Sequence, residues 1–195
     1  MEENQNQLTW TGPFAWPRYE AANGLPSVPN HPGVYLFTVQ SAHGNLIYAA
    51  GITGRPIPLR LREHTLKYKR GDYTVLDIDA IQSGRREEIW HGSWQGWDWT
   101  PARLAEFESQ KPRILDALNK QLTEFRIFVA HITDQRIRER LEAAIMNTLY
   151  QAAPPFCDIP DKGMRLAPRR VNEVPIIMKQ SCSAVLCGLP KYLEV

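Results

Sequence analysis

An arginine and a histidine stand four residues apart in a basic segment that follows two prolines. Arg60 and His64 would share one face of a helix, because residues four apart are neighbours on its surface. Pro56 and Pro58 suit the start of a helix but not its interior, so we expect a helix from about residue 56 to residue 69. A planar guanidinium fits phosphate oxygens, so this helix is a candidate for chemistry at a phosphate.

Two tyrosines lie on the apolar runs that precede this helix. The runs, Val34–Val39 and Leu46–Gly51, are separated by a turn at His43-Gly44-Asn45 and predict a β-hairpin over residues 33–51. Tyr35 lies on the first run and Tyr48 on the second. A tyrosine on a strand is most often a packing residue, and this interpretation stays open for both.

Glu142 is a carboxylate in the last long helix that we expect, which Thr133 or Asp134 caps and which ends near Tyr150. It borders an apolar stripe at helical spacing that is formed by Ile137, Leu141, Ile145 and Leu149. A lone carboxylate facing a cleft suits Mg²⁺, which keeps much of its hydration shell. The alternative is a solvated glutamate that pairs with Arg138 four residues earlier.

Taken in order along the chain, these residues resemble the GIY-YIG nuclease family, from Gly33-Val34-Tyr35 to about residue 158. The resemblance implies that Tyr35 is the general base or positions the water, and that Tyr48 supports the phosphate or the water. It also implies that Arg60 stabilises the pentacovalent phosphorus, that His64 assists proton transfer, and that Glu142 is the sole protein ligand of Mg²⁺ or Mn²⁺.

The chain departs from the family pattern at two places. Ala49 falls where the second tyrosine belongs, with Tyr48 one residue earlier, and one step along a strand sends a side chain to the opposite face. Either a bulge at Ala49–Ala50 returns Tyr48 to the cleft, or the second tyrosine is missing from the site. Cys157 lies about where the family has an asparagine, and Asn172 is a distant substitute.

The order of elements gives a fold class. Besides the hairpin we expect a helix after Thr100-Pro101, interrupted or kinked at Pro112, and a strand over residues 124–131. The expected fold is α+β, and the order of its elements matches the fold that the resemblance implies, a small three-stranded antiparallel sheet flanked by three helices. We expect one domain: an N-terminal arm over residues 1–32, a core over 33–158 with an inserted hairpin at about 73–99, and a C-terminal extension over 159–195.

Composition limits the classes of protein to which the chain can belong. The 195 residues are 43% hydrophobic and 23% charged, which is typical of a globular protein that buries a sizeable core. No apolar run approaches a membrane span, and the acidic N-terminus is not a signal peptide. Three cysteines, an odd number, fit a reducing cytoplasm.

The net charge is only +2, but the cations are clustered. Six Lys or Arg against one acid lie between residues 55 and 70, and a second basic group lies between residues 162 and 170. Such clusters are expected where a protein contacts phosphates, but charge alone favours the alternative of a solvated helix face and a basic loop. The candidate nucleic-acid contacts are Arg55, Arg62, Lys67, Arg169 and Arg170.

Two functions from different classes follow. The first is a metal-dependent endonuclease that hydrolyses DNA phosphodiester bonds with Mg²⁺ or Mn²⁺. The second is a catalytically impaired domain of the same kind that binds nucleic acid or protein, and the shifted Tyr48 and the Cys157 substitution motivate it.

Overall fold

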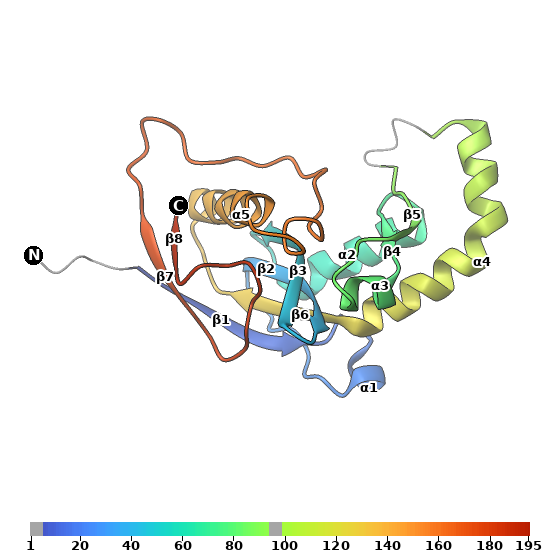
Figure 1. Cartoon of the computed structure of the whole chain (residues 1–195), viewed down its shortest axis with the longest axis horizontal. Coiled ribbons are helices and arrows are strands. Elements are labelled where there is room, and N and C mark those ends of the chain that lie inside the picture. The colour runs from blue at the N-terminus through green and yellow to red at the C-terminus, as the bar shows by residue number, and fades with distance from the viewer. Residues whose placement is uncertain (1–5, 94–98) are drawn as a thin grey trace, which may run out of the picture.

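A six-stranded mixed sheet is the central element of the computed structural model, which describes residues 6–93 and 99–195 (Figure 1). The strands follow the order β3-β2-β6-β1-β7-β8 across the sheet. Their bounds are β1 (Asn6–Phe14), β2 (Gly33–Ser41), β3 (Gly44–Thr53), β6 (Phe125–Ala130), β7 (Ile177–Cys182) and β8 (Tyr192–Glu194).

The expectation of a small three-stranded sheet is wrong, because both chain extensions join the sheet. β2 pairs antiparallel with β3 and β6, but β1 continues the sheet along the other edge of β6. β7 then runs parallel to β1, and β8 returns antiparallel to β7. An exposed strand edge has unpaired amide and carbonyl groups, and these additions satisfy them at β6. β1 and β7 lie far apart in the sequence, so no local pattern predicts their pairing.

Five helices accompany the sheet within the described residues, rather than the three expected. Their bounds are α1 (Glu20–Asn23), α2 (Ile57–Lys69), α3 (Ile78–Gln82), α4 (Pro101–Glu124) and α5 (Gln135–Tyr150). α4 contains Pro112 without ending there, although the helix changes direction along its length (Figure 1). Proline removes one internal hydrogen bond, which is a common cause of such a bend.

The inserted segment forms a shorter hairpin than the alternation of its residues predicted. β4 (Val75–Leu76) pairs antiparallel with β5 (Glu88–Trp90), and α3 lies between them where a strand was expected. Asp77 explains the helix, because its side chain accepts hydrogen bonds from the amides of Asp79 and Ala80. Residues 94–98 of the insertion lie outside the described residues.

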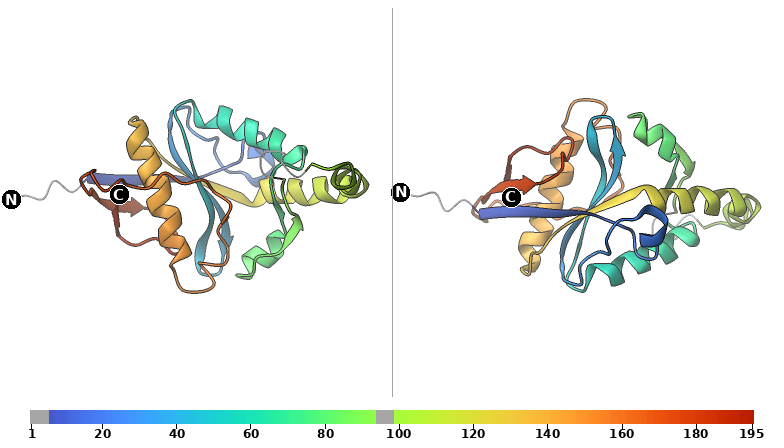
Figure 2. Two further views of the ribbon diagram at one scale, coloured as in Figure 1. Left: turned by 90° about the horizontal axis from the view of Figure 1, so that it is seen from above. Right: turned by 90° about the horizontal axis from the view of Figure 1, so that it is seen from below.

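The two faces of β2 are covered by different helices. Tyr35 and Phe37 belong to the core cluster that includes Leu61 of α2 and Leu118 of α4. Leu36 points to the opposite face, into a second cluster with residues of α5. Figure 2 shows α2 and α5 on different sides of the strand pair β2–β3. β2 is therefore buried on both faces, as its run of consecutive buried residues requires.

Across residues 6–93 and 99–195, no helix is long and apolar enough to cross a membrane. The three cysteines carry free thiols.

The N-terminal arm is fixed to the core by Trp16. This side chain is fully buried, its ring centroid lies 5.1 Å from that of Phe37 and 5.9 Å from that of Phe125, and its Nε1 donates a 2.8 Å hydrogen bond to Thr65 Oγ1. The segment that follows β1 thus belongs to the core that positions α2.

Replacing Trp16 by alanine should lower the free energy of unfolding by about 3 to 5 kcal/mol, because a large buried ring is removed and a cavity remains. Chemical denaturation followed by circular dichroism measures the change. The control is Leu104→Ala on the exposed side of α4, where half of the side chain is open to solvent and the effect should stay within about 0.5 kcal/mol. Equal effects at both positions would contradict a structural role for the arm.

Candidate active site

A cavity of about 250 Å³ lies at the outer edge of β3. β3 is the outermost strand of the sheet, with α2 on one side and α5 on the other (Figure 1). Side chains from both helices reach the cavity around this edge, and residues after α5 complete its wall. The lining residues that can donate, accept or carry charge are Tyr35, Tyr48, Arg60, His64, Tyr68, Tyr73, Thr74, Glu142, Asp161 and Arg165.

A β-bulge places Tyr48 in this cavity. Phe37 pairs with Ala49 and Thr38 pairs with Ile47, so Tyr48 is the extra residue on β3. Because of this insertion, Tyr48 and Ala49 pack in the same cluster, although successive residues on a regular strand point to opposite faces. The bulge lies at Tyr48 itself rather than at Ala49–Ala50, and the second tyrosine lines the cavity despite its shift in sequence.

Gly51 makes room for the ring of Tyr35 across the strand pair. The two residues are paired in register, and a Cβ at Gly51 would come within 2.4 Å of two atoms of the Tyr35 ring. Only a residue without a side chain allows the ring to lie over the backbone of β3 in this way. The glycine of the second motif thus positions the tyrosine of the first.

The Tyr35 hydroxyl lies 2.9 Å from Nε2 of His64, and both groups are buried. Burial raises the pKa of Tyr35 above its ordinary value, while the charge of Arg60 acts in the opposite direction. Burial, together with the nearby charge of Arg60, lowers the pKa of His64 to about 3. At neutral pH the pair is therefore a neutral phenol beside a neutral imidazole, and a neutral imidazole has one nitrogen free to accept a proton.

Arg60 lies at the mouth of the cavity and is held by Glu63. Its Nη1 lies 3.2 Å from Glu63 Oε2, and Arg55 binds the other oxygen of the same carboxylate at 2.8 Å. The side chain of Arg60 keeps 37% of its area exposed, so its remaining donors can reach a solvent-borne ligand. Glu63 therefore fixes the guanidinium without enclosing it.

Glu142 is largely buried and faces the cavity without a protein partner. Within the described residues its carboxylate forms no hydrogen bond or ion pair, and Arg138 binds the carbonyls of Ile132 and Thr133 instead. Burial raises the pKa of Glu142 to about 7, against the lowering effect of Arg60. The sequence-based alternative of a Glu142–Arg138 pair is therefore not formed.

The metal-ligating groups available at Glu142 suit one kind of metal ion. Within the described part of the chain, no group of three or more His, Cys, Asp or Glu side chains could enclose a metal. A single unpaired carboxylate beside open space fits Mg²⁺, which is often held by one or two carboxylates together with waters and substrate phosphates. Glu142 is the residue that would hold it.

The other end of the cavity contains residues that the sequence did not single out. Asp161 is buried, its amide donates to the carbonyl of Tyr48 at 2.8 Å, and burial raises the pKa of its carboxyl. Next to the cavity, and outside its lining, Arg86 lies over the Tyr48 ring at 5.4 Å. Both come from segments outside the expected core, and no local signal marks either. Cys157, the suggested counterpart of the family asparagine, lies outside the lining.

The five expected nucleic-acid contacts differ in their availability. Arg55 pairs with Glu63 and Lys67 with Asp72 at 3.1 Å, while Arg169 lies 3.5 Å from Glu194. Arg62 and Arg170 form no ion pair within the described residues and are exposed. The structure therefore separates these cations into paired and unpaired sets that the charge count did not distinguish.

Comparison of the chain with protein-family models, with curated proteins and with solved structures finds no match in any of the three. The likeness to GIY-YIG nucleases therefore remains a resemblance in short motifs.

Replacing Glu142 by glutamine should stabilise the protein at pH 8 by roughly 2 to 3 kcal/mol and have little effect at pH 5. The pKa of about 7 lies above the value of 4.5 in an unfolded chain, so the wild type loses stability as the pH rises from 4.5 through 7. Glutamine has no such loss. Denaturant unfolding at the two pH values measures the difference.

Glu139→Gln is the matched control three residues earlier on α5. Glu139 pairs with Arg136 at 3.1 Å, and this environment lowers the pKa of its carboxyl. The change should therefore not stabilise the protein at either pH. A Glu142→Gln protein that unfolds like the wild type at pH 8 would contradict the picture of a buried, unpaired carboxylate.

Proposed function

We propose that the protein is a metal-dependent endonuclease that hydrolyses phosphodiester bonds of DNA. The observation that carries the proposal is the convergence of four side chains from three elements on one cavity: Tyr35 of β2, Arg60 and His64 of α2, and Glu142 of α5. Hydrolysis of a phosphodiester needs an activated water, stabilisation of the charge that grows on phosphorus, and help for the leaving oxygen. Residue types for the first two tasks lie together here.

The pair Tyr35–His64 would move the proton of the attacking water. Tyr35 is a poor base by itself, because burial raises its pKa and keeps it a phenol. As the phenol oxygen takes a proton from water, its own proton can pass to Nε2 of His64 across 2.9 Å. The imidazolium that results would be repelled by Arg60, so the transfer requires the negative charge of a bound phosphate nearby.

Arg60 would bind the non-bridging oxygens of that phosphate. Its guanidinium is permanently charged, and its planar fork matches phosphate oxygens. Glu63 and Arg55 restrict its motion, and a donor fixed in advance stabilises developing charge without reorganising during the reaction. Tyr48, returned to the cavity by the bulge, would support the same phosphate or the water.

Mg²⁺ held at Glu142 would polarise a phosphate oxygen and offset negative charge in the transition state. The carboxylate must lose its proton before it can bind a cation. Because the pKa of Glu142 is about 7, activity at limiting Mg²⁺ should rise with pH through that value.

The second candidate is an impaired domain that binds nucleic acid without cutting it. The feature that favours it is the protonation state of the cavity: two buried tyrosines with raised pKa values and a carboxyl group that is half protonated near neutrality. Both candidates use the same surface, so cleavage decides between them.

Glu142→Gln, Arg60→Gln and Tyr35→Phe should each reduce plasmid nicking in Mg²⁺ or Mn²⁺ by about a hundredfold or more, since each removes a group that the transition state needs. Conversion of supercoiled to open-circular plasmid measures the rate. Glu139→Gln makes the same substitution three residues earlier on α5, at a carboxylate that pairs with Arg136 and does not line the cavity, and should retain the wild-type rate.

The outcomes are separable. Wild-type protein that binds plasmid but leaves it intact supports the impaired domain. Nicking that survives the Glu142 change at the wild-type rate would falsify the assignment of that residue.

A further inference from the structure

A second hollow of the surface, of about 410 Å³, lies where the N-terminal arm crosses α2 and α4. We name it the basic groove. Its polar lining is formed by Arg18, Tyr19, Arg62, Thr65, Lys69 and Asn119, with Pro17 and Leu66 as its apolar part. Among the residues that the structure describes, no acidic side chain lines it. None of its residues lines the cavity at the edge of β3, so the two are separate.

The groove and the cavity use opposite flanks of α2. Arg60 lies on one side of the buried stripe of this helix, to which His64 belongs, and Arg62 and Lys69 lie on the other, as the helical period of 3.6 residues requires. α2 has 13 residues and is about 20 Å long. One nucleic-acid strand, with a phosphate about every 3.4 Å, would need about six nucleotides to span that length.

The cations of the groove have no partner. Arg18, Arg62 and Lys69 are exposed and make neither an ion pair nor a side-chain hydrogen bond within residues 6–93 and 99–195. Two other cations near α2 are neutralised, Arg55 by Glu63 and Lys67 by Asp72. Three unneutralised cations around one hollow attract an anion with several charges.

The walls of the groove are held in place. Trp16, next to Pro17, donates a 2.8 Å hydrogen bond to Thr65 of α2, and the Tyr19 hydroxyl donates to Asn119 of α4 at 2.7 Å. These bonds tie the arm to both helices on either side of Arg18. A hollow that is formed before the ligand arrives loses less conformational entropy on binding.

Arg18 has a backbone conformation that arginine seldom adopts. Its φ is 78°, and it is the one residue other than glycine with a positive φ in the described part of the chain. Glycine would adopt this conformation without strain. Strained residues persist where the surroundings hold them, and they concentrate at binding and catalytic sites. An arginine kept at this position points to a use for its charge.

We infer that the basic groove binds the sugar-phosphate backbone of a nucleic acid, away from the bond that is cut. The inference rests on the proposed function for its choice of polyanion, since an acidic peptide carries the same sign of charge. The shared helix favours nucleic acid, because a strand that crosses the exposed face of α2 would reach both the groove and Arg60. The groove would bind phosphates rather than bases, so its affinity should be insensitive to base sequence and sensitive to salt.

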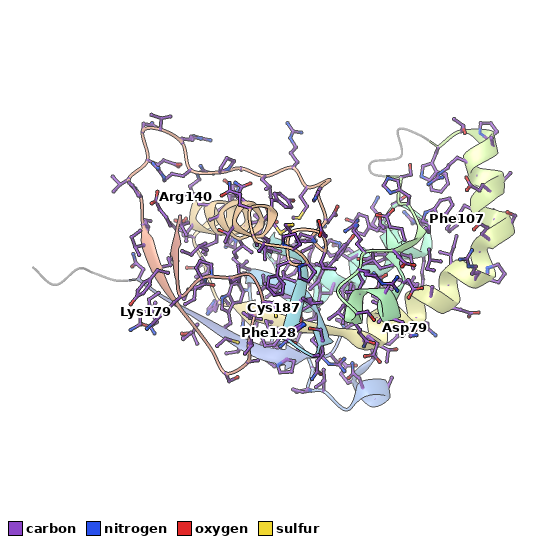
Figure 3. The ribbon with its side chains drawn as sticks, in the orientation of Figure 1. Asp79, Phe107, Phe128, Arg140, Lys179 and Cys187 are labelled. Atoms are coloured by element: carbon purple, nitrogen blue, oxygen red, sulfur yellow. The ribbon has the colours of Figure 1, made fainter. Side chains whose placement is uncertain are left out.

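The test is binding of a fluorescent 20-nucleotide DNA, followed by anisotropy over a series of salt concentrations in EDTA, so that no cutting occurs. The variant R62Q/K69Q should bind more weakly, and the slope of log affinity against log salt should fall by about 0.7 to 0.9 for each phosphate that the variant no longer neutralises. The control K179Q/K191Q removes the same charge, and both lysines lie at or near β7, with Lys179 far from α4 (Figure 3). It should bind like the wild type.

Arg18 allows a second test that separates binding from folding. Arg18→Gly should bind DNA more weakly than the wild type while its melting temperature stays the same or rises, because glycine relieves the backbone strain. Arg18→Lys retains the charge and should recover most of the affinity. If Arg18 had only a structural role, Arg18→Gly would melt at a lower temperature than the wild type.

Equal salt slopes for the groove variant and its control would overturn the inference, as would a wild type that binds oligoglutamate as tightly as DNA. These results are distinct from failure of the proposed function, which appears as an absence of nicking. Groove variants with reduced affinity in EDTA support the groove whether or not the protein cuts.

Discussion

The close approach of the Tyr35 ring to Gly51 is the constraint on which the candidate site depends. It brings a phenol from an inner strand toward the outer edge of the sheet, where α2 supplies His64 as its partner. The bulge at Tyr48 has a related effect, since it turns a second tyrosine toward the same edge. A larger residue at position 51 would displace the ring of Tyr35. A regular strand at position 48 would turn Tyr48 out of the cavity.

Several groups in the cavity at the edge of β3 and in the basic groove are held in states that lower the stability of the fold. Glu142 is largely buried and has no partner among the described residues, burial holds the pKa of His64 well below its ordinary value, and Arg18 adopts a left-handed backbone conformation. Each lies in a hollow of the surface, next to space that a ligand can fill. Proteins tolerate such groups where function requires them, because the packed core supplies the stability that they withdraw.

The elements that carry the site were predictable because their signals are local. The hairpin, α2, the strand β6 and α5 lie close to where turn residues, prolines and apolar periodicity placed them. The sheet as a whole was not predictable, since β1 and β7 are separated by more than 160 residues and pair only after the chain has folded. The short helix α3 was missed because apolar alternation outweighed the cap at Asp77 in our interpretation.

The sequence by itself determined which chemical groups the site has and which of them share a helix face, because spacing along one element fixes direction. Arg60 and His64 on α2, and Glu142 beside the stripe of α5, follow from it. Tertiary structure decided the charge state and the partners of those groups. Burial made His64 neutral and opposed ionisation of Tyr35, and Arg138 binds backbone carbonyls instead of Glu142. Folding also brought Asp161 to the cavity and Arg86 to the ring of Tyr48 from distant segments. The physical reason is that charge state and partnership depend on solvent and on neighbours in space, and the order of residues in a chain specifies neither directly.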